Sequence, residues 1–286
     1  MNIEIFSESI KKLADQLSRC NLSFHRWNDR HLLDSNDVEE IAQFFFIGNS
    51  INYKFWYNSS QQKYKYKNYT GSAAMWASMK DKKKLINLES IASGNNIEMI
   101  LDPLLPMRTE RTKSLLEAGE VLLDSFSGSV LKLCDQAEWH APTIVEIITE
   151  HFPMWKDQQR KIKFNKRAQL FVAMLHGKLG AESKIRDIDK LSCLADYQLP
   201  RVLRHFGVLN YSNKLTQTID NEILICRDSD LEIEIRLATI EAMDLICDEL
   251  KIKHNLRVSP IQLDYILWAQ AKGISKPHHL TPTIAY

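Results

Sequence analysis

Residues 231–250 read LEIEIRLATIEAMDLICDEL, and this stretch indicates the fold class most directly. Ile233, Leu237, Ile240 and Cys247 recur at the spacing of a helix and fall on a common side of it, with charged residues between them. Such a pattern predicts a helix that packs one side against a core.

Helical patterns continue outward from this stretch through most of the 286 residues. They cover residues 3–19, a segment from 38 onward, 72–101, 109–138, 142–152, 165–179, 198–206 and 259–271. Only nine residues are glycine, whereas turn-rich β folds and glycine-looped nucleotide folds usually need more. The exception is the segment 51–70, where Tyr and Lys alternate at period two from Lys63 to Lys67. We therefore predict a mainly α fold with a small β element there.

A break in the helical pattern at Asp102-Pro103-Leu104-Leu105-Pro106 predicts a subdomain boundary. We place an N-terminal helical and β-containing subdomain at residues 1–106 and one compact helical domain at residues 107–286.

Composition excludes several classes of protein. The 37 basic residues are balanced by 36 acidic ones, so no global positive field attracts a nucleic-acid duplex, and a small ligand or a local basic pocket is favoured. The chain lacks a secretory signal and an apolar run of about 18 residues that could span a membrane. Five scattered cysteines without a C-x-x-C pair are typical of reduced thiols. We expect a cytoplasmic protein that does not act at a membrane.

Known catalytic and metal-binding motifs are missing, and the nine histidines are too scattered to predict a metal site. One unusual feature is the pair Lys166-Arg167 at the start of a predicted helix, where cations oppose the helix dipole. The free N–H groups of a helix start together with two cations would suit a phosphate group. A surface pair bonded to local acids explains the same pattern.

Two aspartates lie in apolar surroundings. Asp196 stands between Ala195 and Tyr197, where a carboxylate is either desolvated or paired, although it could equally cap the helix that follows. Asp264 shares a helix face with Trp268 and neighbours Tyr265, an arrangement that suits recognition of a planar base with N–H donors. A core role for these aromatic residues is the alternative.

These stretches together resemble the queuosine salvage family of queuosine 5′-phosphate N-glycosylases/hydrolases. Eight blocks match in family order and cover nearly the whole chain. They are Asn52-Tyr53-Lys54-Phe55-Trp56, Glu110-Arg111 with Leu115-x-Glu117-x-Gly119, Lys166-Arg167-Ala168-Gln169, Asp187-Ile188-Asp189-x-Leu191, Leu194-Ala195-Asp196-Tyr197-x-Leu199-Pro200, Gly207-Val208-Leu209-x-Tyr211-Ser212, Glu232-Ile233-Glu234-Ile235-Arg236 and Leu263-Asp264-Tyr265-x-Leu267-Trp268.

The resemblance implies a helical architecture related to the helix-hairpin-helix DNA glycosylases. It also implies hydrolysis of queuosine 5′-monophosphate, which releases queuine for tRNA modification, without a metal or organic cofactor. Asp196 matches the family's catalytic aspartate. Leu194 stands where the family has an aromatic residue of the base pocket, Gln198 replaces the usual arginine, and Ala269 replaces an acid found in some members.

On this basis we expect Asp196 to stabilise an oxocarbenium-like ribose, to attack C1′ or to activate water. The expected substrate-binding residues are Leu194, Tyr197, Lys166, Arg167, Asp264, Tyr265, Trp268 and Trp56. The expected partner is the nucleotide, with no stable nucleic-acid partner. A DNA-base glycosylase and a non-catalytic module that binds a 7-deazapurine are the alternatives.

Overall fold

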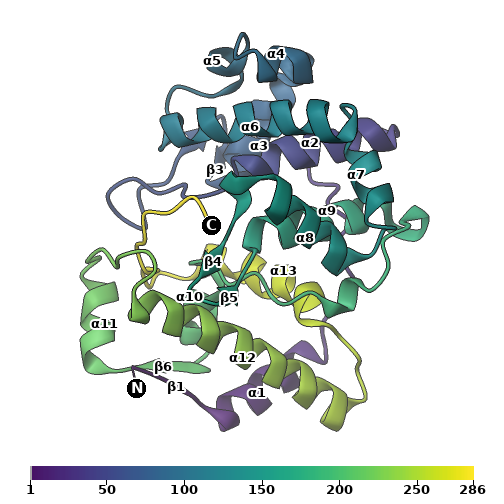
Figure 1. The fold of residues 1–286 in the computed structure, drawn as a ribbon. Coiled ribbons are helices and arrows are strands. Elements are labelled where there is room, and N and C mark those ends of the chain that lie inside the picture. Colours follow the sequence, from purple (N-terminus) through teal and green to yellow (C-terminus); the bar gives the residue numbers. More distant parts are fainter. Residues whose placement is uncertain (1) are drawn as a thin grey trace. The chain divides into compact units, whose positions relative to one another are not determined.

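A computed structural model describes residues 2–286, the side chain of Lys272 excepted, and confirms the mainly α prediction (Figure 1). Within these residues thirteen α-helices are accompanied by three short antiparallel strand pairs. The chain divides into two compact units. Unit 1 contains residues 2–25, 158–166 and 189–282, and unit 2 contains residues 26–157, 167–188 and 283–286.

Unit 1 is built around the long helix α12. Its elements are β1 (Ile3–Ile5), α1 (Ser7–Leu17), β4 (Gln158–Gln159), β5 (Ile162–Lys163), α10 (Leu199–His205), β6 (Leu209–Tyr211), α11 (Asn213–Asp220), α12 (Asp230–His254), α13 (Pro260–Gln270) and the 3-10 helix η5 (Ala271–Gly273). Helix α12 packs against α1, α10 and α13 (Figure 1). Ile235, Met243 and Ile246 lie on its core side, whereas Leu237 is exposed, contrary to the helical pattern.

Residues 3–5 form a strand, so the helix predicted over residues 3–19 is too long. Strand β1 pairs with β6 in the register Ile3↔Tyr211 and Ile5↔Leu209, and α1 begins only at Ser7. The partner strand lies far away in the sequence. Local spacing of apolar residues therefore could not reveal this pairing, and tertiary contact overrides the helical pattern.

Unit 2 contains most of the remaining helices. They are α2 (Val38–Ser50), α3 (Ser72–Asp81), α4 (Leu88–Ala92), α5 (Ile97–Ile100), α6 (Arg108–Phe126), α7 (Val130–Gln136) and α8 (Ala141–His151), with the 3-10 helices η1 (Lys83–Leu85), η2 (Pro153–Trp155) and η3 (Gly180–Glu182). Strands β2 (Lys65–Tyr66) and β3 (Tyr69–Thr70) confirm the β element predicted near residues 51–70. Phe46 packs against the rings of Phe152, Trp155 and Phe171 in the core.

The Asp102–Pro106 segment lies inside unit 2, between α5 and α6, and the units do not divide at residue 106. Each unit instead combines segments from both halves of the chain. Within unit 2, for example, the Lys54 N–H donates to the carbonyl of Tyr286 at 3.0 Å. The pattern over 109–138 is two helices, because Ser127 and Gly128 adopt positive φ angles.

Helix α9 (Lys166–Leu179) begins with Lys166 in unit 1 and continues in unit 2, and the 3-10 helix η4 (Ile188–Lys190) contains the point at which the chain returns to unit 1. Across residues 2–286, no helix combines the length and the apolar character that a membrane crossing demands.

Candidate active site

Unit 1 brings two predicted site residues, Asp196 and Lys166, together in a buried ion pair. The Lys166 Nζ lies 3.7 Å from Asp196 Oδ2, and the two residues are only 7% and 6% exposed. Lys166 is the first residue of α9, two residues after the end of strand β5, whereas Asp196 lies in the loop before α10. The fold thus places a fixed negative charge beside a fixed positive charge in a region of little water.

The two carboxylate oxygens of Asp196 face different partners. Oδ1 accepts hydrogen bonds from the main-chain N–H groups of Gln198 at 2.6 Å and Leu199 at 3.2 Å, at the start of α10. The alternative considered from the sequence, in which Asp196 is the N-cap of the following helix, is wrong, because the N-cap of α10 is Gln198. Asp196 lies two residues before it and binds the N–H groups of the N-cap and of the first helical residue. Oδ2 is the oxygen that faces Lys166. These two hydrogen bonds hold the carboxylate in one orientation and leave its second oxygen for an electrostatic role.

A second buried carboxyl group, that of Asp264 on α13, is tied to the same loop. Its Oδ2 accepts a hydrogen bond of 2.8 Å from the N–H of Leu194, two residues before Asp196. Burial and, to a smaller extent, the negative charge of Asp196 raise the pKa of Asp264 to about 8. Asp264 is therefore mostly a neutral acid at pH 7 and carries a proton that it can donate.

The residues that directly follow the two aspartates in the chain, Tyr197 and Tyr265, each pack against another ring within unit 1. Tyr265 stacks on His25, with ring centroids 3.7 Å apart, and lies 5.7 Å from the ring of Trp268. Tyr197 is buried, with its ring 4.3 Å from that of His278. The stacking of His25 on Tyr265 has no counterpart in the sequence patterns, because a single histidine in an irregular segment carries no periodicity.

Two predicted substrate-binding residues lie in unit 2. Arg167 is fully buried, and its guanidinium donates to main-chain carbonyls of Asn49, Ser50 and Met154. Trp56 is also buried, with the Lys54 ammonium 4.2 Å from its ring centroid. Both residues shape the interior of unit 2, and their contact with a substrate stays a prediction.

Leu194 and Gln198 depart from the family pattern. Each lies two positions from Asp196 in the sequence, and both are buried. Leu194 donates its main-chain N–H to Asp264. This contact does not depend on the side chain at position 194, and any residue except proline could make it. The Gln198 Oε1 accepts a hydrogen bond of 3.1 Å from the Arg201 guanidinium. A different cation, Arg201, thus lies one helical turn after the position where the family has arginine.

The structure adds Arg236, to which the sequence analysis assigned no role. Its side chain is fully buried on α12, its Nε donates to the carbonyl of Ala195 at 2.9 Å, and its guanidinium lies 3.8 Å from the ring centroid of Phe164. A signal was present, because Glu232 and Arg236 are one helical turn apart on a helix whose core face is otherwise apolar.

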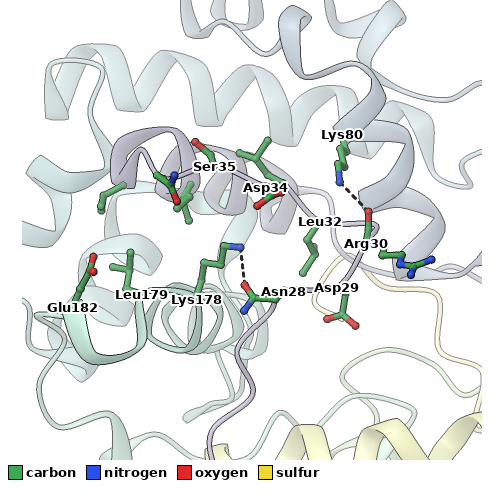
Figure 2. A pocket seen from close by; sticks show the side chains of 14 residues that line it. Asn28, Asp29, Arg30, Leu32, Asp34, Ser35, Lys80, Lys178, Leu179 and Glu182 are labelled. Carbon is green, nitrogen blue, oxygen red and sulfur yellow. Dashed lines mark hydrogen bonds between the residues drawn. The ribbon is translucent and has the colours of Figure 1, made fainter.

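A cavity of about 730 Å³ in unit 2 has none of these residues in its lining (Figure 2). Lys178 points toward Asn28, its Nζ 2.8 Å from the Asn28 Oδ1, and the Nζ of Lys80 donates to the carbonyl of Arg30 at 2.9 Å. Its lining includes the basic residues Arg30, Lys80 and Lys178 and the acidic residues Asp29, Asp34 and Glu182. This balance of charge does not favour a phosphate over other polar ligands.

Comparison with known proteins gives a consistent result. The family described as "Queuosine salvage protein" matches residues 31–286. The chain is 28% identical to the queuosine 5′-phosphate N-glycosylase/hydrolase of Dictyostelium discoideum, over 100% of this chain and 94% of the relative. It is 29% identical to the mouse protein of the same name, over 98% and 93%, and 27% identical to that of Sphaerobacter thermophilus, over 98% and 91%.

Proposed function

The chain belongs to the queuosine salvage protein family, and from this membership we propose that it is a nucleotide N-glycosidase that hydrolyses queuosine 5′-monophosphate. The reaction consumes one water molecule. Its hydroxyl group adds to C1′ to give ribose 5-phosphate, and the departing queuine gains a proton. The observation that carries the proposal is the buried pair of Asp196 and Lys166, with a second buried carboxyl group, that of Asp264, bonded to the same loop.

Asp196 supplies the negative charge that the reaction needs. Positive charge develops on the ribose when the bond between C1′ and the base breaks. A carboxylate that is already oriented by two main-chain N–H groups stabilises this charge without reorganising. The same oxygen, Oδ2, could instead attack C1′ or take a proton from water, and these alternatives stay open.

Asp264 supplies a proton to the departing base. Queuine is a 7-deazapurine, so position 7 is carbon and cannot accept the proton that activates ordinary purines. A neutral carboxyl group can donate to another acceptor on the base and stabilise the developing anion. Asp196 and Asp264 thus resemble other pairs of carboxyl groups whose surroundings give one the role of anion and the other the role of acid.

The remaining predicted residues have supporting roles. In this proposal Lys166 binds the 5′-phosphate, and the rings of Tyr265 and Trp268 pack against the flat base. Contacts of Leu194, Tyr197, Arg167 and Trp56 with the substrate also remain predictions, as do the cytoplasmic location and the absence of a stable nucleic-acid partner.

The direct test incubates the purified protein with queuosine 5′-monophosphate and follows queuine and ribose 5-phosphate by mass spectrometry. Stoichiometric release of both products over many turnovers is expected. Binding of the nucleotide without release would identify a 7-deazapurine-binding module. Release of bases from duplex DNA, with a steep dependence on salt, would instead identify a DNA-base glycosylase.

Lys166→Ala is expected to raise KM for queuosine 5′-monophosphate more than KM for the free nucleoside queuosine, because only the monophosphate carries the group that the ammonium contacts. Steady-state kinetics with both substrates measure the difference. Lys253→Ala is the matched control, since it also removes a lysine–aspartate pair in unit 1 but at the surface. Equal increases of KM for both substrates would show that Lys166 does not contact the phosphate.

The kcat/KM value for the monophosphate is expected to stay level below pH 8 and to fall about tenfold per pH unit above it. The reason is that Asp264, with its pKa raised to about 8, loses its proton in the free enzyme over this range. Rate measurements from pH 6 to pH 10 give the profile, and Asp264→Asn should remove the fall. A kcat/KM that instead rises through pH 8 would show that the ionised carboxylate recognises the base.

A further inference from the structure

Arg236 connects the two segments that carry the ion pair of unit 1. The segment before Lys166 passes over its guanidinium through Phe164, two residues upstream of Lys166. The segment before Asp196 is bound through the carbonyl of Ala195, the residue directly upstream of Asp196. Arg236, Phe164 and Ala195 are all buried, so each contact is shielded from water.

The hydrogen bond to Ala195 fixes the peptide group that leads into Asp196. A peptide group is planar, so its carbonyl oxygen and its N–H have fixed relative directions. The Ala195 carbonyl accepts from Arg236, and the N–H of Asp196 in the same peptide group donates to the carbonyl of Leu194 at 2.7 Å. With both ends of the peptide group bonded, the backbone at Asp196 has little freedom to rotate.

The stacking of the Arg236 guanidinium on Phe164 fixes the segment that leads into Lys166. A guanidinium is flat, so one face can lie on an aromatic ring while an edge donates to a carbonyl. Phe164 is followed by Asn165, which has a positive φ of 48° and turns the chain into Lys166 at the start of α9. Holding the Phe164 ring therefore holds the position from which the Lys166 side chain begins.

We propose that Arg236 is a positioning residue, which sets the geometry of the Lys166–Asp196 pair by clamping Phe164 and the Ala195 carbonyl from one rigid helix. This inference rests on the proposed function, because it assigns Arg236 an effect on turnover through Asp196. A lysine at this position keeps a positive charge, but it cannot both stack as a plane and donate sideways.

A double-mutant cycle tests the proposal. Arg236→Lys should lower kcat for queuosine 5′-monophosphate about ten- to a hundredfold, with a smaller change of KM, because a misplaced catalytic group costs turnover more than binding. In the Asp196→Asn background the same substitution should change kcat no more than about threefold, since the residue that it positions is already lost. Arg236→Met also removes the positive charge, and its further decrease of kcat measures the contribution of that charge.

Arg204→Lys is the matched control, because Arg204 also combines a bidentate contact, to Asp220, with an aromatic ring, Tyr211, in unit 1 away from the pair. It should lower Tm without changing kcat. Equal fold-losses from Arg236→Lys in the wild-type and Asp196→Asn backgrounds would overturn the proposal, as would an unchanged kcat.

A structural measurement separates this inference from the proposed function. Crystal structures of the wild type and Arg236→Lys should show the distance between Lys166 Nζ and Asp196 Oδ2 changed by about 0.5 Å or more, the tolerance typical of a functional site. If the wild type does not hydrolyse the nucleotide, the proposed function fails and this distance alone decides: an unchanged distance overturns the role of Arg236.

Discussion

Asp196→Asn is expected to lower kcat for queuosine 5′-monophosphate by about a hundredfold or more, the usual cost of losing one preorganised electrostatic group. The asparagine keeps the size of the side chain, and its amide oxygen can still accept from the N–H groups of Gln198 and Leu199. The fold should therefore persist while the negative charge is lost. Single-turnover kinetics measure the change in the chemical step directly.

Asp248→Asn is the matched control, because it removes a carboxylate on the exposed side of α12 in the same unit. It should leave kcat unchanged. Near-normal turnover by Asp196→Asn would remove Asp196 from the mechanism. A nucleophilic role for Asp196 differs from an electrostatic one in a further respect, because only the nucleophile forms a covalent ribosyl intermediate that can be trapped.

Asp264→Asn is expected to flatten the pH dependence of stability between about pH 4 and pH 8. The native pKa of about 8 is far above the value of about 3.9 in an unfolded chain, so the native state binds more protons over this range. The free energy of unfolding then falls as pH rises, by about 1.4 kcal/mol per pH unit from this group. Between about pH 4 and pH 8, the free energy of unfolding therefore falls by a total on the order of 5 kcal/mol because of this group.

Urea unfolding at several pH values from 4 to 9 measures this slope. The asparagine oxygen can keep the bond from Leu194, but the buried amide N–H groups need new partners, which offsets part of the gain at pH 8. Asp124→Asn, at an exposed position of α6, should leave the slope almost unchanged. An Asp264→Asn protein with the wild-type slope would show that Asp264 is ionised in the folded protein.

The sequence predicts the helices well because their apolar spacing is a local property. The structure confirms helices close to the predicted bounds at α8, α9, α10, α12 and α13. What the sequence could not predict depends on distant partners: strand β1 needs β6, and Leu237 on α12 is exposed although its spacing places it with the core.

For the candidate site, too, local features could be predicted from the sequence and contacts between distant residues could not. Asp196 and Asp264 could be singled out because a carboxylate in an apolar run is unusual, and the family resemblance gave them roles. The 3.7 Å contact between Asp196 and Lys166 could not be predicted, since thirty positions separate them in the chain. Arg236 was part of a matching block, but its bond to Ala195 exists only in three dimensions.

The pairing of β1 with β6 has a consequence for synthesis of the chain. Strand β1 leaves the ribosome about two hundred residues before its partner. At roughly 5–20 residues per second, translation leaves β1 without β6 for about 10–40 seconds. The apolar side chains of Ile3 and Ile5 lack their β6 partner during that interval, so the nascent chain exposes an unpaired strand until β6 emerges.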